Sequence, residues 1–286
     1  MHTIKHKNFV AQINPVGAEL SSLKFRQQEY LWQGDERYWG GRAPILFPIV
    51  GALKNGQMSY KGSRYTMPRH GLARRSVFEL LHQSDDTITL VLSADTDSLQ
   101  QYPWNFVLQV TFTLTDNGLV IQYDILNNDN SNMLFTIGSH PAFALSVNAP
   151  ADLEAYTVHI EQNEPLSLYQ LNEEGLLDRD CKSFALDNII QLNQTVFNED
   201  ALVFRDVKAN TISLQRDGQR VLSVDTGGAP HLGVWAKPGA AFVCIEPWLG
   251  TSDFTDSNGQ FESKEDLQSL PAGESFSHRI GVSFPD

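Results

Sequence analysis

The sequence predicts an all-β protein, folded as one large antiparallel β-sandwich domain over residues 1–286. Apolar and polar residues alternate over short runs, and Gly, Asn, Asp and Pro separate nearly all of these runs. No stretch of eleven or more residues keeps a helical periodicity. Hydrophobic residues make up 41% of the 286 residues and charged residues 19%, so the chain can form a real core.

The clearest strand pattern is a hairpin at residues 106–126. Residues 106–114 and 119–126 alternate around the turn signal TDNG, which predicts two paired strands with one buried face. A short helix is expected near residues 98–102, ending before Pro103. Shorter runs predict further strands at 87–92, 157–160, 211–214, 221–224, 231–235 and 241–245.

Composition and charge narrow the function classes. The formal net charge of −13 disfavours nucleic acid and anionic membrane surfaces as partners. The opening residues MHTIKHKNFV contain no apolar stretch that could act as a signal peptide, and no window approaches the roughly 20 apolar residues of a membrane helix. We therefore expect a cytoplasmic protein.

The two cysteines, Cys181 and Cys244, lie far apart in the chain. Cys244 stands in the apolar run AFVCI, where a free thiol packs as a small apolar side chain. His and Cys do not cluster at zinc-ligand spacing. We therefore expect free thiols and no structural metal.

A histidine interrupts a strand pattern in FTIGSHPAFAL, residues 135–145. Apolar residues recur at every second position on both sides of the sequence Gly138-Ser139-His140-Pro141. Because proline cannot donate to a sheet ladder, His140 is expected at a bend or strand end. It is either a core histidine bonded to backbone or a group that transfers protons near neutral pH.

A carboxylate follows a buried run in CIEPWLGTSD, residues 244–253. Glu246 comes directly after the apolar residues 241–245, so we expect it at the end of a buried strand. Burial raises the pKa of a carboxyl group toward the range of a general base, although a structural ion pair is the alternative. Trp248, two residues on, could stack on the apolar face of a sugar.

Two further stretches carry arginine or histidine beside apolar residues. In GRAPILFPIVG, residues 41–51, Arg42 precedes an apolar run, and its guanidinium is suited to vicinal oxygens. In RHGLARRS, residues 69–76, His70 and Arg74 are candidate binding residues. The neighbouring Arg64, Arg69 and Arg75 are interpreted as a charged hairpin edge.

Together, GRAPILFP, RHGLAR, GSHPAF and CIEPW resemble the aldose 1-epimerase, or galactose mutarotase-like, family, and the resemblance extends from residues 13–23 to residues 270–284. It implies a galactose mutarotase-like supersandwich, and the activity it implies needs neither a cofactor nor a metal. It implies that His140 is the general acid and Glu246 the general base. The residues it implies for binding sugar hydroxyls are Arg42, His70 and Asp200, with Asp206 as the alternative to Asp200.

Such an enzyme takes a proton from the anomeric hydroxyl and gives one to the ring oxygen, so that the ring opens and closes again on either face. Glu246 as carboxylate and His140 as imidazolium suit these roles. The predicted partner is therefore a small sugar, taken to be a free hexose.

Three other functions stay open. An epimerase of hexose 6-phosphates would use Arg42, Arg69 and Arg74 as an anion site, and RHGLAR is similar to a stretch in phosphosugar epimerases of this family. A non-catalytic carbohydrate-binding or sensing protein would have no need of an acid and base pair. A glycoside hydrolase or lyase usually needs two carboxylates, and no motif supplies a second one.

Overall fold

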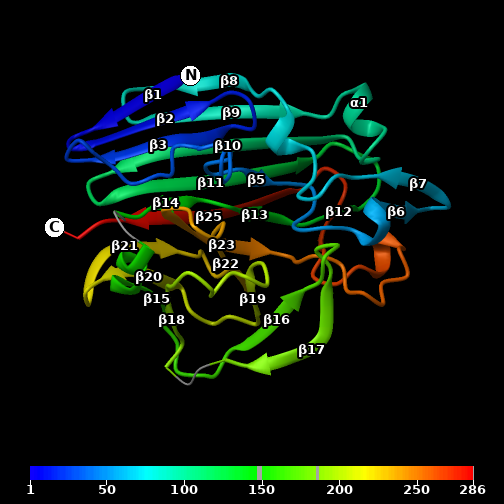
Figure 1. Cartoon of the computed structure of the whole chain (residues 1–286). Helices are drawn as coiled ribbons and strands as arrows, with labels where there is room; N and C mark the ends of the chain where they lie inside the picture. The colour runs from blue at the N-terminus through cyan, green and yellow to red at the C-terminus, as the bar shows by residue number, and fades with distance from the viewer. Residues whose placement is uncertain (147–149, 185–186, 286) are drawn as a thin grey trace.

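Two large antiparallel sheets form most of the molecule (Figure 1). The structure is a computed structural model that describes residues 1–146, 150–184 and 187–285. Within these residues, the one α-helix is α1 (Thr96–Leu99), and the 3₁₀ turns are η1 (Lys54–Gly56), η2 (Ala73–Arg75), η3 (Pro150–Ala155) and η4 (Phe261–Ser263). The prediction of an all-β fold is confirmed.

The first large sheet has nine strands. In spatial order they are β18 (Ile189–Gln191), β15 (Tyr156–Ile160), β20 (Thr211–Arg216), β21 (Gln219–Asp225), β25 (Ser275–Ser283), β11 (Gly118–Asn127), β10 (Phe106–Thr115), β9 (Thr87–Ser93) and β8 (Glu79–Gln83). The predicted hairpin is β10 and β11, with Thr115 paired to Gly118 across the turn. One face of each strand is buried, as the alternation predicts.

The second large sheet has eight strands and carries the site described below. In spatial order they are β17 (Leu177–Ser183), β16 (Ser167–Leu171), β19 (Leu202–Arg205), β22 (His231–Trp235), β23 (Phe242–Leu249), β13 (Ile137–Ser139) and β5 (Ile45–Leu46), with β14 (Ala142–Ala144) also on β23.

Three smaller sheets complete the strands. A four-stranded sheet contains β1 (His2–His6), β2 (Phe9–Asn14), β3 (Glu19–Phe25) and β4 (Gln28–Glu29). The two-stranded sheets are β6 (Gln57–Tyr60) with β7 (Ser63–Thr66), and β12 (Met133–Phe135) with β24 (Gln268–Leu270). No helix among the described residues has the length and apolarity needed to cross a bilayer.

The sheets pack on a shared apolar core. One cluster of buried side chains includes Leu108 of the nine-stranded sheet, Phe143 of the eight-stranded sheet and Leu20 of the four-stranded sheet. Both faces of β23 are covered, since seven of its eight residues are buried. This packing gives the expected sandwich and leaves β23 as a central strand.

Two expected boundaries are wrong. The short helix lies at Thr96–Leu99 because Asp95 caps it, accepting a hydrogen bond from the Ser98 N–H. The strand expected to end at residue 245 continues to Leu249, so Glu246 lies inside β23 and not at its end.

Strand β23 continues through Pro247, although proline has no N–H to donate to a neighbouring strand. The Ile245 N–H donates to the Pro141 carbonyl, and N–H groups two residues apart in a strand point the same way. In the register of this pairing Pro247 faces Ser139, so its missing N–H leaves one ladder hydrogen bond unmade at the last residue of β13.

Candidate functional site

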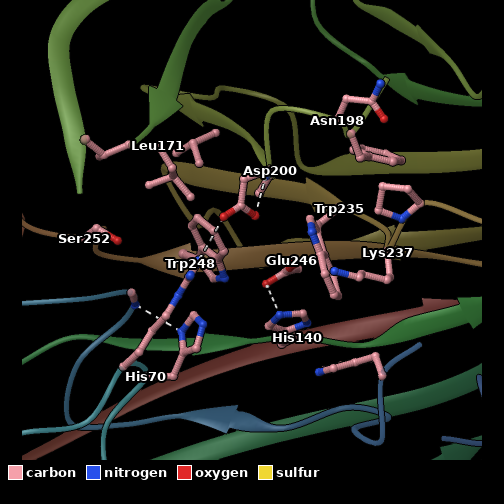
Figure 2. A pocket seen from close by; sticks show the side chains of 18 of the residues that line it. His70, His140, Leu171, Asn198, Asp200, Trp235, Lys237, Glu246, Trp248 and Ser252 are labelled. Atoms are coloured by element: carbon pink, nitrogen blue, oxygen red, sulfur yellow. Dashed lines mark hydrogen bonds and ion pairs between the residues drawn. The ribbon is translucent and has the colours of Figure 1, made fainter. Parts of the chain in front are cut away.

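A pocket of about 440 Å³ opens over the eight-stranded sheet (Figure 2). Strands β22 and β23 and the gap between β13 and β14 supply its floor, and loops from distant parts of the chain form its walls. The lining residues are Trp39, Gly51, Arg69, His70, Arg74, His140, Leu171, Leu177, Phe197, Asn198, Asp200, Ala201, Val203, Trp235, Lys237, Pro238, Glu246, Trp248 and Ser252.

Sheet register sets His140 opposite Glu246. The pairing with β23 keeps one register on both sides of the gap, where the facing residues are Gly138 and Trp248, then Ala142 and Cys244. His140 is midway in sequence between Gly138 and Ala142, and Glu246 is midway between their partners, Trp248 and Cys244. The two residues therefore face each other. Nε2 of His140 lies 3.3 Å from Oε2 of Glu246 (Figure 2). Of the expected bend or strand end, the structure shows the strand end: His140 directly follows Ser139, the last residue of β13.

Both members of this pair are buried, with 8% of His140 and 1% of Glu246 exposed. Burial raises the pKa of Glu246 well above its ordinary value and lowers the pKa of His140 to about 3. Burial thus disfavours the charged form of each group: the His140 imidazole is neutral near pH 7, and the proton of Glu246 is held more tightly than in an exposed carboxyl group.

Two buried polar atoms of the pair lack hydrogen-bond partners, which indicates that the site binds a ligand. His140 Nδ1 and Glu246 Oε2 are buried and have no hydrogen-bond partner in the protein. The 3.3 Å contact between the two side chains is thus not aligned as a hydrogen bond. Buried groups of this kind are costly unless a ligand satisfies them, so the pair is prepared for bound hydroxyl groups.

His70 lies beside the pair, with its ring 5.7 Å from the His140 ring. The Gly51 N–H donates to His70 Nδ1 at 3.1 Å, which leaves Nε2 to carry the ring proton. Burial lowers the pKa of His70 well below its ordinary value, so the ring is neutral. A backbone φ of +68° and a hydrogen bond from the His70 N–H to the Gly51 carbonyl hold the residue in place.

The indole of Trp248 lies over glycines of both neighbouring strands. A Cβ at Gly138 would lie 2.5 Å from Trp248 Cδ1, and a Cβ at Gly233 would lie 2.4 Å from Trp248 Cη2. Only glycine at both positions lets the ring lie in this way. The indole Nε1 is buried without a partner, so this ring offers the pocket both an apolar face and a donor.

Two aromatic residues that the sequence analysis did not select also form the site. Trp39 stacks on His140, with ring centroids 5.0 Å apart, and Trp235 meets His140 edge-on at 5.9 Å. A Cβ at Gly41 would lie 2.5 Å from Trp39 Cζ2, so Gly41 allows the indole to fold back over the chain. In the sequence, the glycines Gly40 and Gly41 directly after Trp39 could have indicated that its side chain packs closely against the backbone.

Cationic side chains gather on the wall of the pocket, where Arg69, Arg74 and Lys237 all line it. The interpretation of Arg69 as a hairpin-edge charge is wrong, because the chain leaves the β6–β7 hairpin at Thr66 and turns into the pocket wall. Arg69 lies 3.8 Å from Asp200, measured from Nη2 to Oδ2.

The structure distinguishes the two candidate aspartates. Asp200 lines the pocket, whereas Asp206, at the far end of β19, is not among the lining residues. Asp200 has a backbone φ of +74°, and its Oδ1 accepts a hydrogen bond from the Ala201 N–H. Oδ2 faces Arg69 and the pocket.

Arg42 is not brought to the pocket. Its Nη2 donates to the Gln33 carbonyl at 2.8 Å, and its backbone N–H donates to Glu19 Oε1. These bonds tie down the loop that carries Trp39. Arg42 is therefore not among the residues that line the pocket, and it supports Trp39 through the backbone.

Comparisons with known proteins agree with this architecture. The aldose 1-epimerase family matches residues 1–283. The protein LacX, encoded on a plasmid of Lactococcus lactis subsp. lactis, is 30% identical over 273 residues, which are 91% of each chain.

Two solved structures share the whole fold. A galactose mutarotase related enzyme from Lactobacillus acidophilus is 30% identical with a TM-score of 0.95, covering 100% of this chain and 97% of its own. A galactose mutarotase-like protein from Lactobacillus casei ATCC 334 is 28% identical with a TM-score of 0.94, and both chains are fully covered. The resemblance seen in the four sequence motifs is thereby confirmed, and this chain belongs to the aldose 1-epimerase family.

Proposed function

We propose that this protein is an aldose 1-epimerase that interconverts the α and β anomers of a free hexose. The observation that carries the proposal is the buried His140–Glu246 pair on the pocket floor, with Nε2 of His140 3.3 Å from Oε2 of Glu246. Ring opening needs one proton acceptor and one proton donor on neighbouring oxygens, and this pair supplies both without net uptake of a proton.

The reaction begins with a proton shift inside the pair. Movement of one proton from Glu246 to His140 gives the carboxylate and imidazolium that the chemistry uses. The carboxylate then takes the proton of the anomeric hydroxyl while the imidazolium protonates the ring oxygen. The bond between the anomeric carbon and the ring oxygen breaks, a free aldehyde forms, and closure on the other face reverses each proton transfer.

The remaining polar groups bind and orient the sugar. The His70 Nε2–H and the Trp248 Nε1–H are donors, and the Asp200 carboxylate is an acceptor. Arg74 provides further donors at the wall. A sugar presents hydroxyls that donate and accept together with an apolar ring face, and Trp248 and Trp235 offer surfaces for that face.

A phosphorylated hexose is the second candidate substrate. Arg69, Arg74 and Lys237 place three cationic groups on the wall of one pocket, in a chain whose net charge is −13. Only Arg69 among them has a carboxylate of the pocket within 4.0 Å, which is Asp200. An acidic chain that gathers cations at its pocket is suited to an anionic substituent.

Polarimetry of freshly dissolved anomers tests the proposal and separates the two substrates. We expect accelerated mutarotation of free hexoses, and a loss of about 10²–10⁴-fold in Glu246→Gln and His140→Asn, the usual contribution of a positioned acid or base. The double variant should be little slower than the slower single variant, because paired groups act as a unit. A near wild-type rate in folded Glu246→Gln would refute the mechanism.

The same assay with hexose 6-phosphates decides the substrate charge. A large preference for the phosphorylated sugar that disappears in Arg69→Ala and Arg74→Ala would favour the second candidate. Arg64→Ala, on the exposed strand β7 and outside the pocket, is the matched control and should change neither rate.

A further inference from the structure

A thiol lies next to the proton-transfer pair. Cys244 and Glu246 are two residues apart on β23, so their side chains lie on the same face of the sheet. His140 reaches this face from the facing strand. One ligand atom from each of His140, Cys244 and Glu246 lies within 4.8 Å of the other two. Nothing in the proton-transfer mechanism uses the thiol.

The spacing of these atoms is close to that of a tetrahedral zinc site. Zinc binds nitrogen and oxygen at about 2.0–2.2 Å and thiolate at about 2.3 Å, which places neighbouring ligand atoms roughly 3.3–3.7 Å apart. The 3.3 Å from His140 Nε2 to Glu246 Oε2 already matches one edge of that tetrahedron. The remaining edges, at most 4.8 Å, need a closure of about 1 Å, which side-chain rotations can supply.

The donor set selects the type of ion. Thiolate and imidazole favour zinc and similar borderline-soft ions, whereas magnesium and calcium prefer oxygen ligands alone. Glu246 Oε2 has no hydrogen-bond partner to lose, and both His140 and Glu246 face the pocket, through which an ion and a fourth ligand enter.

We propose that His140, Cys244 and Glu246 form an inhibitory binding site for a zinc-like divalent cation. Binding releases the Cys244 thiol proton, and any proton on Glu246, to solvent. The bound ion then occupies the lone pairs that take and return the sugar protons, so it competes with the sugar. The inhibition rests on the proposed epimerase function, but the binding does not. The site is therefore testable without any turnover.

Cobalt(II) serves as the spectroscopic probe, because a cobalt–thiolate bond gives a near-ultraviolet charge-transfer band. We expect this band in the wild-type protein at one equivalent, and its loss in Cys244→Ser and Cys244→Ala. Zinc affinity, measured by calorimetry, should fall at least about tenfold in both variants, since even outer-shell partners of metal ligands have effects of that size.

Cys181→Ser is the matched control, because Cys181 is the other free thiol and is exposed on β17. It should keep the band and the affinity. Thermal melting confirms that each variant is folded, and the alanine variant avoids burying a new polar atom. The inference is overturned if the folded wild-type protein shows no thiolate band, if the band depends on Cys181, or if both Cys244 variants bind zinc as tightly as the wild type.

Discussion

Glu246 carries a stability cost that its proposed role as general base explains. Because burial raises its pKa above the reference value of 4.5, folding takes up a proton at this residue, and stability falls as pH rises from about 4.5 to the raised pKa. Glu246→Gln removes that cost while keeping the shape. We expect the variant to be more stable than wild type by on the order of 1–3 kcal/mol at pH 7, although the proposed mechanism makes it inactive.

Urea unfolding at several pH values measures this difference. The advantage of Glu246→Gln should shrink as the pH is lowered toward 4.5, because the wild-type carboxyl group is then protonated in both states. A variant less stable than wild type at every pH would show that the carboxyl group is ionised and paired in the folded protein.

Asp200 and Asp206 allow a matched test of substrate binding. Both have a left-handed backbone, with φ of +74° and +59°, a conformation that asparagine also tolerates. Asp200→Asn removes a charged acceptor from the pocket, so KM should rise about tenfold, with a smaller change in kcat. Asp206→Asn should leave both constants unchanged. Steady-state kinetics with the preferred sugar measures the two variants, and equal effects would contradict the assignment.

Candidate site residues could be predicted from the sequence where they interrupt or end a run of strand-forming apolar residues. His140 interrupts a strand and Glu246 follows an apolar run, and both signals are local. The positions of Arg42 and Arg69 depend on where loops cross the sheet, which no local pattern reports. Trp39 reaches His140 from a distant loop, so its role follows from tertiary packing alone.

Strand glycines provide a test at the scale of the element. In Gly233→Ala the new methyl group would lie 2.4 Å from the Trp248 indole, so the ring must move. We expect a loss of about 1–3 kcal/mol in stability, as in other overpacked sites, together with a higher KM. Gly281→Ala in β25 is the control, since its Cβ would meet its nearest neighbour at 3.4 Å.

Denaturant unfolding and tryptophan fluorescence report both effects. The control should change stability by less than about 1 kcal/mol. Alanine also lowers the conformational entropy of the unfolded chain relative to glycine, which favours the folded state. If the two alanine variants behave alike, the close packing of Trp248 does not constrain β22.

Elements were easier to predict than their ends. The alternation in residues 106–126 gives the β10–β11 hairpin and its buried face, because period-two burial is a local property. Pro247 marked an apparent end to β23, but the strand continues, because the missing N–H removes only one ladder hydrogen bond, at the last residue of β13. From the sequence alone a proline is interpreted as a strand end, because the strand that pairs with it is not known.

At the scale of the whole molecule, two buried histidines destabilise the fold in acid, in the direction opposite to the effect of Glu246. Burial lowers the pKa of His140 to about 3 and that of His70 well below its ordinary value. The unfolded chain binds these protons near pH 6.5, so stability is full above that pH and is lost as the pH falls toward 3. Each residue contributes a slope of about 1.4 kcal/mol per pH unit within its window.

Unfolding midpoints between pH 7.5 and pH 5 measure this slope. His70→Asn should flatten it, whereas His82→Asn, on the exposed edge strand β8, should not. An unchanged slope in His70→Asn would place the acid sensitivity elsewhere in the chain.

The shared register of His140 and Glu246 has a consequence for heating. Their separation is fixed by adjacent strands of a central sheet, while Arg69, His70 and Asp200 reach the pocket from connecting loops. Loops open at lower free energy than core strands. Warming should therefore raise KM first and leave kcat following its ordinary temperature dependence until the sheet itself melts, so that saturating sugar keeps the enzyme working almost to its unfolding temperature.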